Sequence, residues 1–200
     1  MSDTPWWAGE GFWKKIAIWV TALMAVILIV LTYDTLAKIQ AGSERVPAYS
    51  VINQRIDYRF DAERNFQVPV IGADAPLFGK KLGEDEAQTL VSYGKKIIQG
   101  RNCMNCHTLL GNGAYYAPDL SKAWLDPAWG AEAAREQLMI AFLMNPDTNA
   151  RTFGSGRRMP NMQITEDEAR AIVAFLKWMS AIDTNGFPYN FKPIAQGGES

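Results

Sequence analysis

The sequence predicts a mainly α-helical protein in which a single N-terminal transmembrane helix precedes a helical domain, with a loop and short-strand insertion between them. Three observations support this prediction. Residues 16–33 form an uncharged apolar run, helical periodicity with acidic first turns recurs after residue 83, and the intervening segment contains several prolines. We place the boundaries at residues 1–40, 41–83 and 84–200.

Composition excludes several classes of protein. Lys and Arg total 20 and Asp and Glu total 21, so the net charge of −1 provides no field that would attract nucleic acid, and no nucleic-acid partner is expected. A hydrophobic content of 48% excludes a disordered chain. Two cysteines and one histidine exclude a disulfide-stapled scaffold and a four-ligand zinc site. Metal chemistry in this chain must therefore involve His107.

The apolar run at residues 16–33 predicts a transmembrane helix of about residues 14–36. Its 18 residues span about 27 Å as a helix, close to the ~30 Å of a bilayer core. A cleaved signal peptide is the alternative, but the run is longer than the usual signal core and no small-residue cleavage site follows Tyr33. We therefore expect a retained anchor in the lipid bilayer. Aromatic and basic residues flank the run as at membrane interfaces: Trp6, Trp7, Trp13, Lys14, Lys15 and Tyr33.

The insertion at residues 41–83 is predicted to be rich in loops, with one or two short strands. Apolar residues alternate with polar ones along part of it, which is typical of a half-buried strand. The alternating positions are Ile52, Gln54, Ile56, Tyr58 and Phe60.

Three helices are predicted after the insertion. Residues 84–99 combine an acidic first turn with helical apolar spacing, and Gly94 in their middle is either a local weakness or a close approach of another helix, which we favour. Residues 131–144 form an amphipathic helix that ends before Pro146. The last helix begins with the capping box of Thr165 and Glu168 and is expected to end near residue 183.

Cys103-Met104-Asn105-Cys106-His107 is the attachment pattern of c-type haem, in which two thiols bind the porphyrin and the adjacent imidazole binds iron. A thioredoxin-like redox pair would require a βαβ setting, and a zinc site would require a fourth ligand. We therefore predict one covalent haem c, attached at Cys103 and Cys106 with His107 as axial ligand. The domain at residues 84–200 is then a class I mono-haem cytochrome c domain with a C-terminal tail.

The second axial ligand of the iron is predicted to be a methionine, because the chain holds no second histidine. Met159 is favoured because Pro160 stiffens the chain beside it, and Met162 is the alternative. An open iron site that binds gas is a further alternative. Arg157 and Arg158 either pair with haem propionates or a neighbouring subunit, or are simply solvated.

Covalent attachment of haem c also predicts the topology, because in bacteria it takes place outside the cytoplasmic membrane. Residues 34–200 are then periplasmic and the N-terminus is cytoplasmic, in a single-pass protein of the inner membrane. The lysine pair Lys14 and Lys15 lies on the cytoplasmic side in this arrangement, as the positive-inside rule expects.

The run GRNCMNCHTLLGNGAYYAPDL resembles the small cytochrome c subunit of respiratory nitric oxide reductase. The resemblance continues through GRRMPNMQ and FLKWMSAIDTNGFPYN, and it covers the anchor and roughly residues 94–192. It implies a heterodimer with a large membrane subunit that holds haem b, haem b3 and non-haem iron and reduces nitric oxide to nitrous oxide. This chain would accept electrons from a periplasmic cytochrome c or cupredoxin, pass them to haem b, and hold no catalytic residue itself.

The resemblance also implies a calcium ion shared between the subunits, bound here by the carbonyl of Gly113 and the hydroxyl of Tyr115. Tyr116 would pack beside the haem. Two features depart from the family pattern. The connection between the anchor and the haem domain, residues 41–80, is longer than in shorter family members, and we expect it to pack on the large subunit or beside the donor site. The arginine pair directly precedes Met159, where relatives often have one intervening residue.

Three alternatives keep the haem but change the role. The chain could serve as the electron-entry subunit of an oxygen-reducing haem-copper oxidase, or as a free membrane-tethered electron shuttle. A haem-based gas sensor would require an open iron site and a signalling domain, and the sequence contains no such domain.

Overall fold

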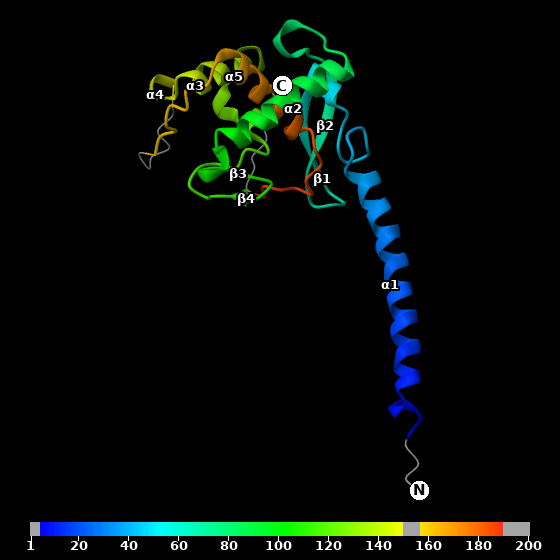
Figure 1. Ribbon diagram of the computed structural model, residues 1–200. Helices are drawn as coiled ribbons and strands as arrows, with labels where there is room; N and C mark the ends of the chain where they lie inside the picture. Colours follow the sequence, from blue (N-terminus) through cyan, green and yellow to red (C-terminus); the bar gives the residue numbers. More distant parts are fainter. Residues whose placement is uncertain (1–4, 150–156, 190–200) are drawn as a thin grey trace.

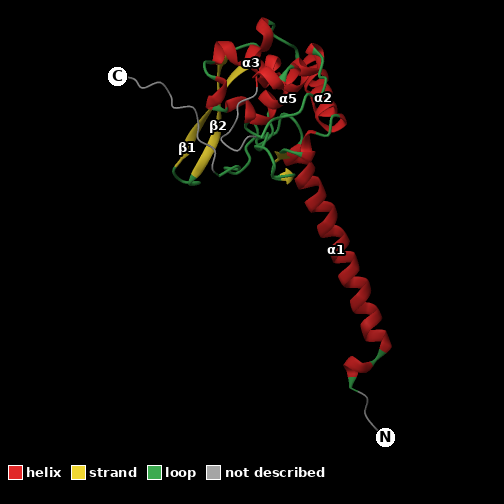
Figure 2. Ribbon diagram, turned by 90° about the vertical axis from the view of Figure 1, so that its left-hand side faces the viewer, coloured by secondary structure: helices red, strands yellow, loops and turns green. Residues whose placement is uncertain are grey.

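The computed structural model describes residues 5–149 and 157–189 (Figure 1). A long N-terminal helix projects from a mainly helical domain, and a two-stranded hairpin lies on one side of that domain (Figure 2). The predicted class, mainly helical with short strands between the apolar helix and the domain, is confirmed. The helices are α1 (Glu10–Ile39), α2 (Glu84–Gly100), α3 (Glu132–Met144), α4 (Pro146–Asn149) and α5 (Glu166–Ser180), and the strands are β1 (Gln54–Asp61), β2 (Phe66–Asp74), β3 (Thr108–Leu109) and β4 (Asn112–Gly113).

Helix α1 is long and apolar enough to cross a membrane, and none of its residues is buried against the domain. It begins four residues before and ends three residues after the predicted range of 14–36. Ion pairs one turn apart lie near its two ends, Glu10 with Lys14 at 2.8 Å and Asp34 with Lys38 at 2.9 Å. An apolar surface of this length without a protein partner fits a membrane anchor.

The insertion forms the antiparallel hairpin β1–β2. Ile56 and Tyr58 are buried as the alternation predicted, whereas Ile52 lies in a preceding 3₁₀ turn (Tyr49–Asn53) and Phe60 is 54% exposed. The prediction of a strand was therefore wrong at Ile52 and right at Phe60, which lies in β1 although its side chain faces solvent. The alternation of apolar and polar residues did not reveal β2, because Pro69 interrupts it. Pro69 pairs with Tyr58 in the register of the hairpin. A proline is tolerated in β2 because the other edge of this strand is unpaired in the two-stranded sheet.

The core of the domain is built where α2 crosses α5. A Cβ at Gly94 would overlap the Ala171 carbonyl oxygen and lie 2.9 Å from Cβ of Phe175, so this glycine permits close contact of the two helices. The interpretation of Gly94 as a close approach is thus confirmed. Trp124 and Met139 complete the buried core beside these helices.

The start of α5 has the predicted capping box. The Thr165 amide donates to Glu168 Oε2 at 2.9 Å, and the Glu168 amide donates to the Thr165 hydroxyl at 3.3 Å. The helix ends at Ser180, three residues before the predicted end near Asp183. Asp183 instead turns away to form polar contacts with other segments, which explains the earlier end.

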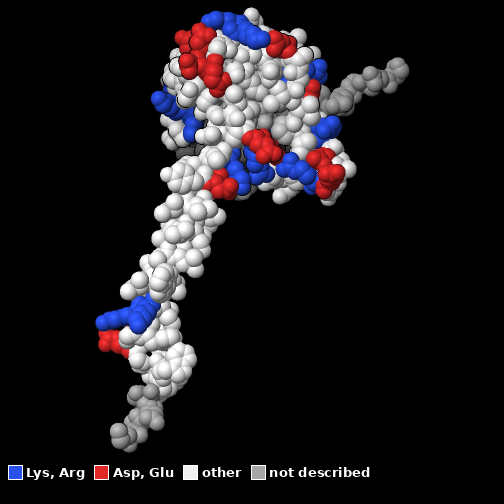
Figure 3. Space-filling model, turned by 90° about the vertical axis from the view of Figure 1, so that its right-hand side faces the viewer, with Lys and Arg blue, Asp and Glu red and all other residues white. Residues whose placement is uncertain are grey.

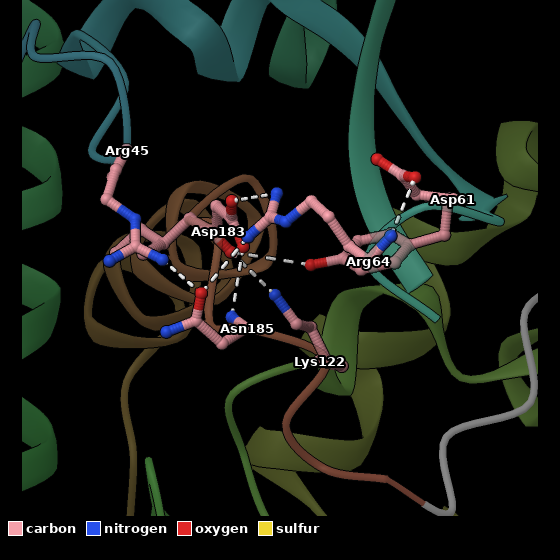
Figure 4. Close-up of polar contacts among 8 residues, drawn as sticks. Arg45, Asp61, Arg64, Lys122, Asp183 and Asn185 are labelled. Carbon is pink, nitrogen blue, oxygen red and sulfur yellow. Dashed lines mark hydrogen bonds and ion pairs between the residues drawn. The ribbon is translucent and has the colours of Figure 1, made fainter. Parts of the chain in front are cut away.

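A polar joint connects the linker after α1, the hairpin and the segment after α5 (Figure 4). We use this name for Arg45, Arg64, Lys122, Asp183 and Asn185. Arg64 donates to Asp183 at 2.7 Å and to Asn185 at 3.0 Å, Arg45 donates to the Asn185 side chain, and the Asp183 amide donates to the Arg45 carbonyl at 3.1 Å. Burial would raise the pKa of the Asp183 carboxyl, but hydrogen bonds from Arg64 and the Asn185 amide outweigh it and lower that pKa.

Lys122 is the buried member of the polar joint. Its ammonium donates to the Ile182 carbonyl at 2.8 Å and lies 4.6 Å from the centre of the Tyr58 ring. Burial lowers its pKa to about 7, and the attraction of Asp183 offsets this only in part. The Tyr58 hydroxyl donates to the Ser180 carbonyl at 3.0 Å, so the hairpin and Lys122 meet at the end of α5.

Candidate haem site

The two cysteines lie on one tight turn directly after α2. Asn102, with φ 54°, reverses the chain into a 3₁₀ turn (Cys103–Asn105), and the amides of Cys106 and His107 donate to the Cys103 carbonyl at 3.2 and 3.0 Å. Both thiols are free and half-buried. The turn therefore presents two thiols and the following imidazole together, as covalent attachment of a porphyrin requires.

The environment of Cys103 argues against a reactive dithiol. Burial raises the pKa of the Cys103 thiol, and the neighbouring Cys106 adds to this increase, although a backbone hydrogen bond opposes it. A thioredoxin-like pair needs a thiol whose pKa is lowered, because the thiolate is the nucleophile. The Cys103 thiol thus lacks the lowered pKa of a thioredoxin-like nucleophile.

The imidazole of His107 is oriented by the backbone. Its Nδ1 lies 2.7 Å from the Pro118 carbonyl oxygen. A carbonyl can only accept a hydrogen bond, so Nδ1 holds the proton and Nε2 keeps its lone pair for a metal. This contact fixes both the tautomer and the ring orientation that an axial ligand needs.

The loop that supplies Pro118 is held by Asp119, a residue that sequence reasoning missed. Its carboxylate accepts from the Thr108 hydroxyl at 2.6 Å, from the Ser121 amide at 2.7 Å and from the Gly111 amide at 3.2 Å. The signal available in the sequence was an aspartate directly after a proline in an irregular stretch, where such side chains bind nearby amides. Asp119 thus fixes the loop that carries the acceptor of His107.

Gly113 closes the same loop beside the histidine. It has φ +124°, and a Cβ there would overlap the His107 carbonyl oxygen and lie 3.0 Å from the Met104 carbonyl oxygen. The β3–β4 hairpin can therefore fold over the attachment turn only with glycine at this position.

The two candidate methionines both lie on the irregular segment that leads into α5. Met159 and Met162 are half-buried and pack against the hydrophobic core. Among the helical methionines, Met139 and Met179 are 2% and 4% exposed and belong to that core, whereas Met144 is 39% exposed. The preference for Met159 over Met162 stays a prediction. Residues 154–156 (Gly-Ser-Gly), which precede this segment in the sequence, lie outside the described residues.

Arg157 joins the methionine segment to the loop after the histidine. Its Nη1 donates to the Tyr116 carbonyl at 2.8 Å, and the guanidinium lies 4.7 Å from the centre of the Tyr116 ring. Arg158 is exposed. The structure thus shows that Arg157 connects the two loops. The pairing of Arg157 and Arg158 with haem propionates or a neighbouring subunit stays a prediction.

The residues implied for calcium lie on the surface of the same loop. Tyr115 is 80% exposed, and its hydroxyl donates to the Gly111 carbonyl at 2.9 Å. Within residues 5–149 and 157–189, no three His, Cys, Asp or Glu side chains gather as they would around a metal ion. Calcium binding by Gly113 and Tyr115 stays a prediction, since a site shared between subunits would need oxygen ligands from the partner.

Comparisons with known proteins agree with this geometry. Residues 91–180 match the cytochrome c family, and a cytochrome c domain implies covalent haem c. The chain is 36% identical over 115 residues to the C subunit of nitric oxide reductase from Stutzerimonas stutzeri, covering 56% of this chain and 74% of the relative. For the corresponding protein of Paracoccus denitrificans the identity is 32% over 116 residues, covering 57% and 76%. For that of Halomonas halodenitrificans it is 36% over 103 residues, covering 49% and 64%.

Proposed function

Because this chain belongs to the family of nitric oxide reductase C subunits, we propose that it is the membrane-anchored electron-transfer subunit of such a reductase. It accepts electrons from a periplasmic cytochrome c or cupredoxin and passes them to haem b of the catalytic subunit, which reduces nitric oxide to nitrous oxide. The similarity across three quarters of the length of two relatives is the observation that supports this proposal most strongly.

In this proposal the chain's residues hold and orient one haem. The thiols of Cys103 and Cys106 would form the thioether attachments, and His107 would offer Nε2 to the iron. Met159 would offer its thioether, with Met162 as the alternative. When bound, the haem supplies a one-electron redox centre, and a His/Met ligand pair raises its reduction potential. The hydrogen bond from His107 to the Pro118 carbonyl would hold the imidazole in the orientation that an iron ligand needs.

The chemistry of nitric oxide reduction belongs to the partner subunit in this proposal. A binuclear gas-reducing centre requires several histidine ligands, and this chain has one histidine, already assigned to haem c. The chain therefore moves electrons and leaves bond formation to the large membrane subunit.

The proposed location follows from the anchor and the haem. Helix α1 crosses the bacterial inner membrane once, with the N-terminus in the cytoplasm and the haem domain in the periplasm. The charge pattern supports this orientation, because Lys14 and Lys15 directly precede the apolar run.

The test is to purify the complex that contains this chain in mild detergent and supply an artificial electron donor. Consumption of nitric oxide and of oxygen is then measured in parallel. We expect rapid loss of nitric oxide with one nitrous oxide formed for every two consumed. Consumption of oxygen alone would contradict the proposal in favour of a haem-copper oxidase, and consumption of neither would favour a tethered shuttle.

The axial ligand has its own test. In Met159→Leu, which conserves volume, the methionine–iron charge-transfer band at the red end of the oxidised spectrum should disappear, and in the matched variant Met162→Leu it should persist. The reverse result would assign the ligand to Met162. A spectrum without this band in the unmodified protein would contradict methionine ligation.

A further inference from the structure

An ion pair between the end of α2 and the start of α5 flanks the predicted haem site on both sides in the sequence. Arg101 follows α2 directly, and Glu168 lies in the first turn of α5. The Arg101 Nη2 donates to both carboxylate oxygens of Glu168, at 2.9 and 3.0 Å, across 67 positions of the chain. Every residue predicted to attach the haem or to bind its iron lies between these two positions. The pair therefore connects the two ends of the haem-binding part of the chain.

This ion pair is less exposed than most charges on the molecule. Figure 3 shows charged side chains of both signs spread over the surface of the domain, and both side chains of the Lys81–Asp74 pair are more than half exposed. Such pairs contribute little, because water and salt screen them. The Glu168 side chain is only 13% exposed and the Arg101 side chain 35%. The attraction between Arg101 and Glu168 is therefore screened less.

The Glu168 carboxylate also holds the end of the methionine segment, residues 157–164. Its Oε2 accepts from the Thr165 amide at 2.9 Å, and Thr165 directly follows the buried Ile164. Hydrogen bonds from the Thr165 amide and from Arg101 lower the pKa of the Glu168 carboxyl, against the effect of burial, so the group is ionised at neutral pH. One carboxylate thus contacts both the residue that leads into the attachment turn and the residue that ends the methionine segment.

The position of this pair relative to the α2–α5 crossing makes it effective. The helices approach most closely at Gly94, and Arg101 lies seven residues further along the chain, about 10 Å along the axis of α2. A contact at this distance from the crossing point resists a change in the crossing angle more than a contact at the crossing point does. The ion pair therefore limits the separation of the attachment turn from the methionine segment.

We propose that the Arg101–Glu168 ion pair positions the methionine segment against the haem and so determines how readily the methionine ligand leaves the iron. The attachment turn carries the two cysteines, whereas the segment before α5 carries Met159 and Met162. Any movement between these two parts opens the methionine side of the iron to an external ligand. This inference rests on the proposed haem ligation, holds for either methionine, and does not depend on which gas the complex reduces.

The experiment measures imidazole binding to the oxidised, haem-loaded full chain in mild detergent. Imidazole replaces the methionine only when the methionine segment has moved away, so its apparent affinity reports the fraction of open molecules. In Glu168→Gln the side chain can still accept from the Thr165 amide, as glutamine does in a capping box, but it loses the charge that attracts Arg101. We expect imidazole to bind about three- to tenfold more tightly to this variant, with the methionine–iron band present before imidazole is added.

Glu166→Gln is the matched control. Glu166 lies in the same first turn and pairs with Arg170 of the same helix at 2.8 Å, so the variant makes the same charge change without touching the link to α2. Imidazole should bind to it as to the unmodified chain. Equal affinity in Glu168→Gln and the unmodified chain would overturn the proposal, and so would an equal increase in both variants, which would assign the effect to net charge.

Variants of Arg101 separate the ion pair from a general loss of stability. Arg101→Gln should bind imidazole about as tightly as Glu168→Gln, whereas Arg101→Lys should bind it more weakly than Arg101→Gln, because a single nitrogen makes both contacts in the structure. The double variant Arg101→Gln/Glu168→Gln should bind no more tightly than either single variant, since the same interaction is removed. Additive effects would overturn the proposal. A missing methionine–iron band in the unmodified chain would instead overturn the proposed ligation, and this inference with it.

Discussion

The α2–α5 crossing and the polar joint hold the same domain together by different means. At the crossing, Gly94 lies against the backbone of α5, and Val91 and Ile172 are almost fully buried. At the polar joint, Arg45, Arg64 and Lys122 reach acceptors across three segments that are far apart in the sequence. Apolar contact responds little to pH or salt, whereas a charged joint responds to both.

This difference suggests that the helix crossing and the polar joint position different parts of the domain. The helix pair sets the position of the attachment turn, because Cys103 follows α2 directly. The polar joint sets how the hairpin and the anchor meet the domain. Disturbing the crossing should therefore affect haem incorporation, and disturbing the joint should affect the hairpin first.

Gly94→Leu should have the largest effect. The new side chain would overlap the Ala171 carbonyl, which cannot move without breaking α5, and the expected loss of unfolding free energy is about 3 kcal/mol or more. Haem incorporation and thermal unfolding of the purified chain measure it. Gly100→Ala is the control, because no atom lies within 4 Å of its added Cβ, and it should keep wild-type stability or gain up to about 1 kcal/mol.

Lys122→Met should change the pH dependence of stability. The native pKa of about 7 lies below the ordinary 10.5, so between these values the unfolded chain binds a proton that the native chain does not. Unfolding free energy should therefore rise with pH in this window, by up to about 1.4 kcal/mol per pH unit, and Lys122→Met should remove this contribution. Denaturant titrations from neutral to alkaline pH measure the slope.

A part of that slope should persist in Lys122→Met. Burial lowers the pKa of Lys177 to about 8, against the attraction of Glu136 and Glu132, and its ammonium donates to the Ala75 carbonyl at 2.9 Å. The exposed Lys80→Met serves as the control and should leave the slope unchanged. An identical slope in Lys122→Met and the unmodified chain would show that Lys122 keeps its ordinary pKa.

Arg64→Gln should loosen the hairpin without affecting the helices. It removes the ion pair with Asp183 and the contact of the guanidinium with the Phe66 ring, 4.4 Å from the ring centre. Amide hydrogen exchange in β1 and β2 should become faster while exchange in α2 and α5 is unchanged, and high salt should reproduce part of the effect. Equal protection of the hairpin in both proteins would mean that burial of Tyr58 alone holds it.

Arg157→Gln should have the smallest effect, confined to the haem spectrum. Loss of the contact with Tyr116 frees the methionine segment, so the methionine–iron band should be lost at a lower pH on alkaline titration than in the unmodified protein. Arg158→Gln removes one positive charge at the neighbouring position, and its methionine–iron band should be lost at the same pH as in the unmodified chain. If the two variants behave alike, net charge rather than loop closure is responsible.

Sequence reasoning was most successful where the signal is local. The capping box at Thr165 and the apolar run of α1 are set by neighbouring residues, and the structure confirms both. The close approach at Gly94 is also confirmed, although the contact is with Ala171 of another helix, because a glycine in mid-helix is itself a local signal. The spacing of the haem motif is equally local. The cysteines and His107 could thus be found without any knowledge of the fold.

The remaining features depend on contacts between distant segments. No periodicity indicated that Arg64 would meet Asp183, 119 positions away, or that Lys122 would be buried at the end of α5. The role of Asp119 as the centre of the histidine loop was missed for a different reason: its partners Thr108, Gly111 and Ser121 are close in sequence but lie in an irregular loop without periodicity. The predicted end of α5 was three residues too late, because Asp183 pairs with Arg64 and does not continue the helix.

The hydrogen bond from the Asp183 amide to the Arg45 carbonyl gives the domain a mechanical property. The tether enters the domain at Arg45, and the chain leaves α5 at Asp183, so the two ends of the folded domain are fastened to each other. Beyond this link the chain returns toward the haem site, because Phe187 and Leu110 line one cavity with Asp34, Thr35 and Lys38 of α1. The end of the anchor and the loop that follows His107 are therefore neighbours in the folded domain.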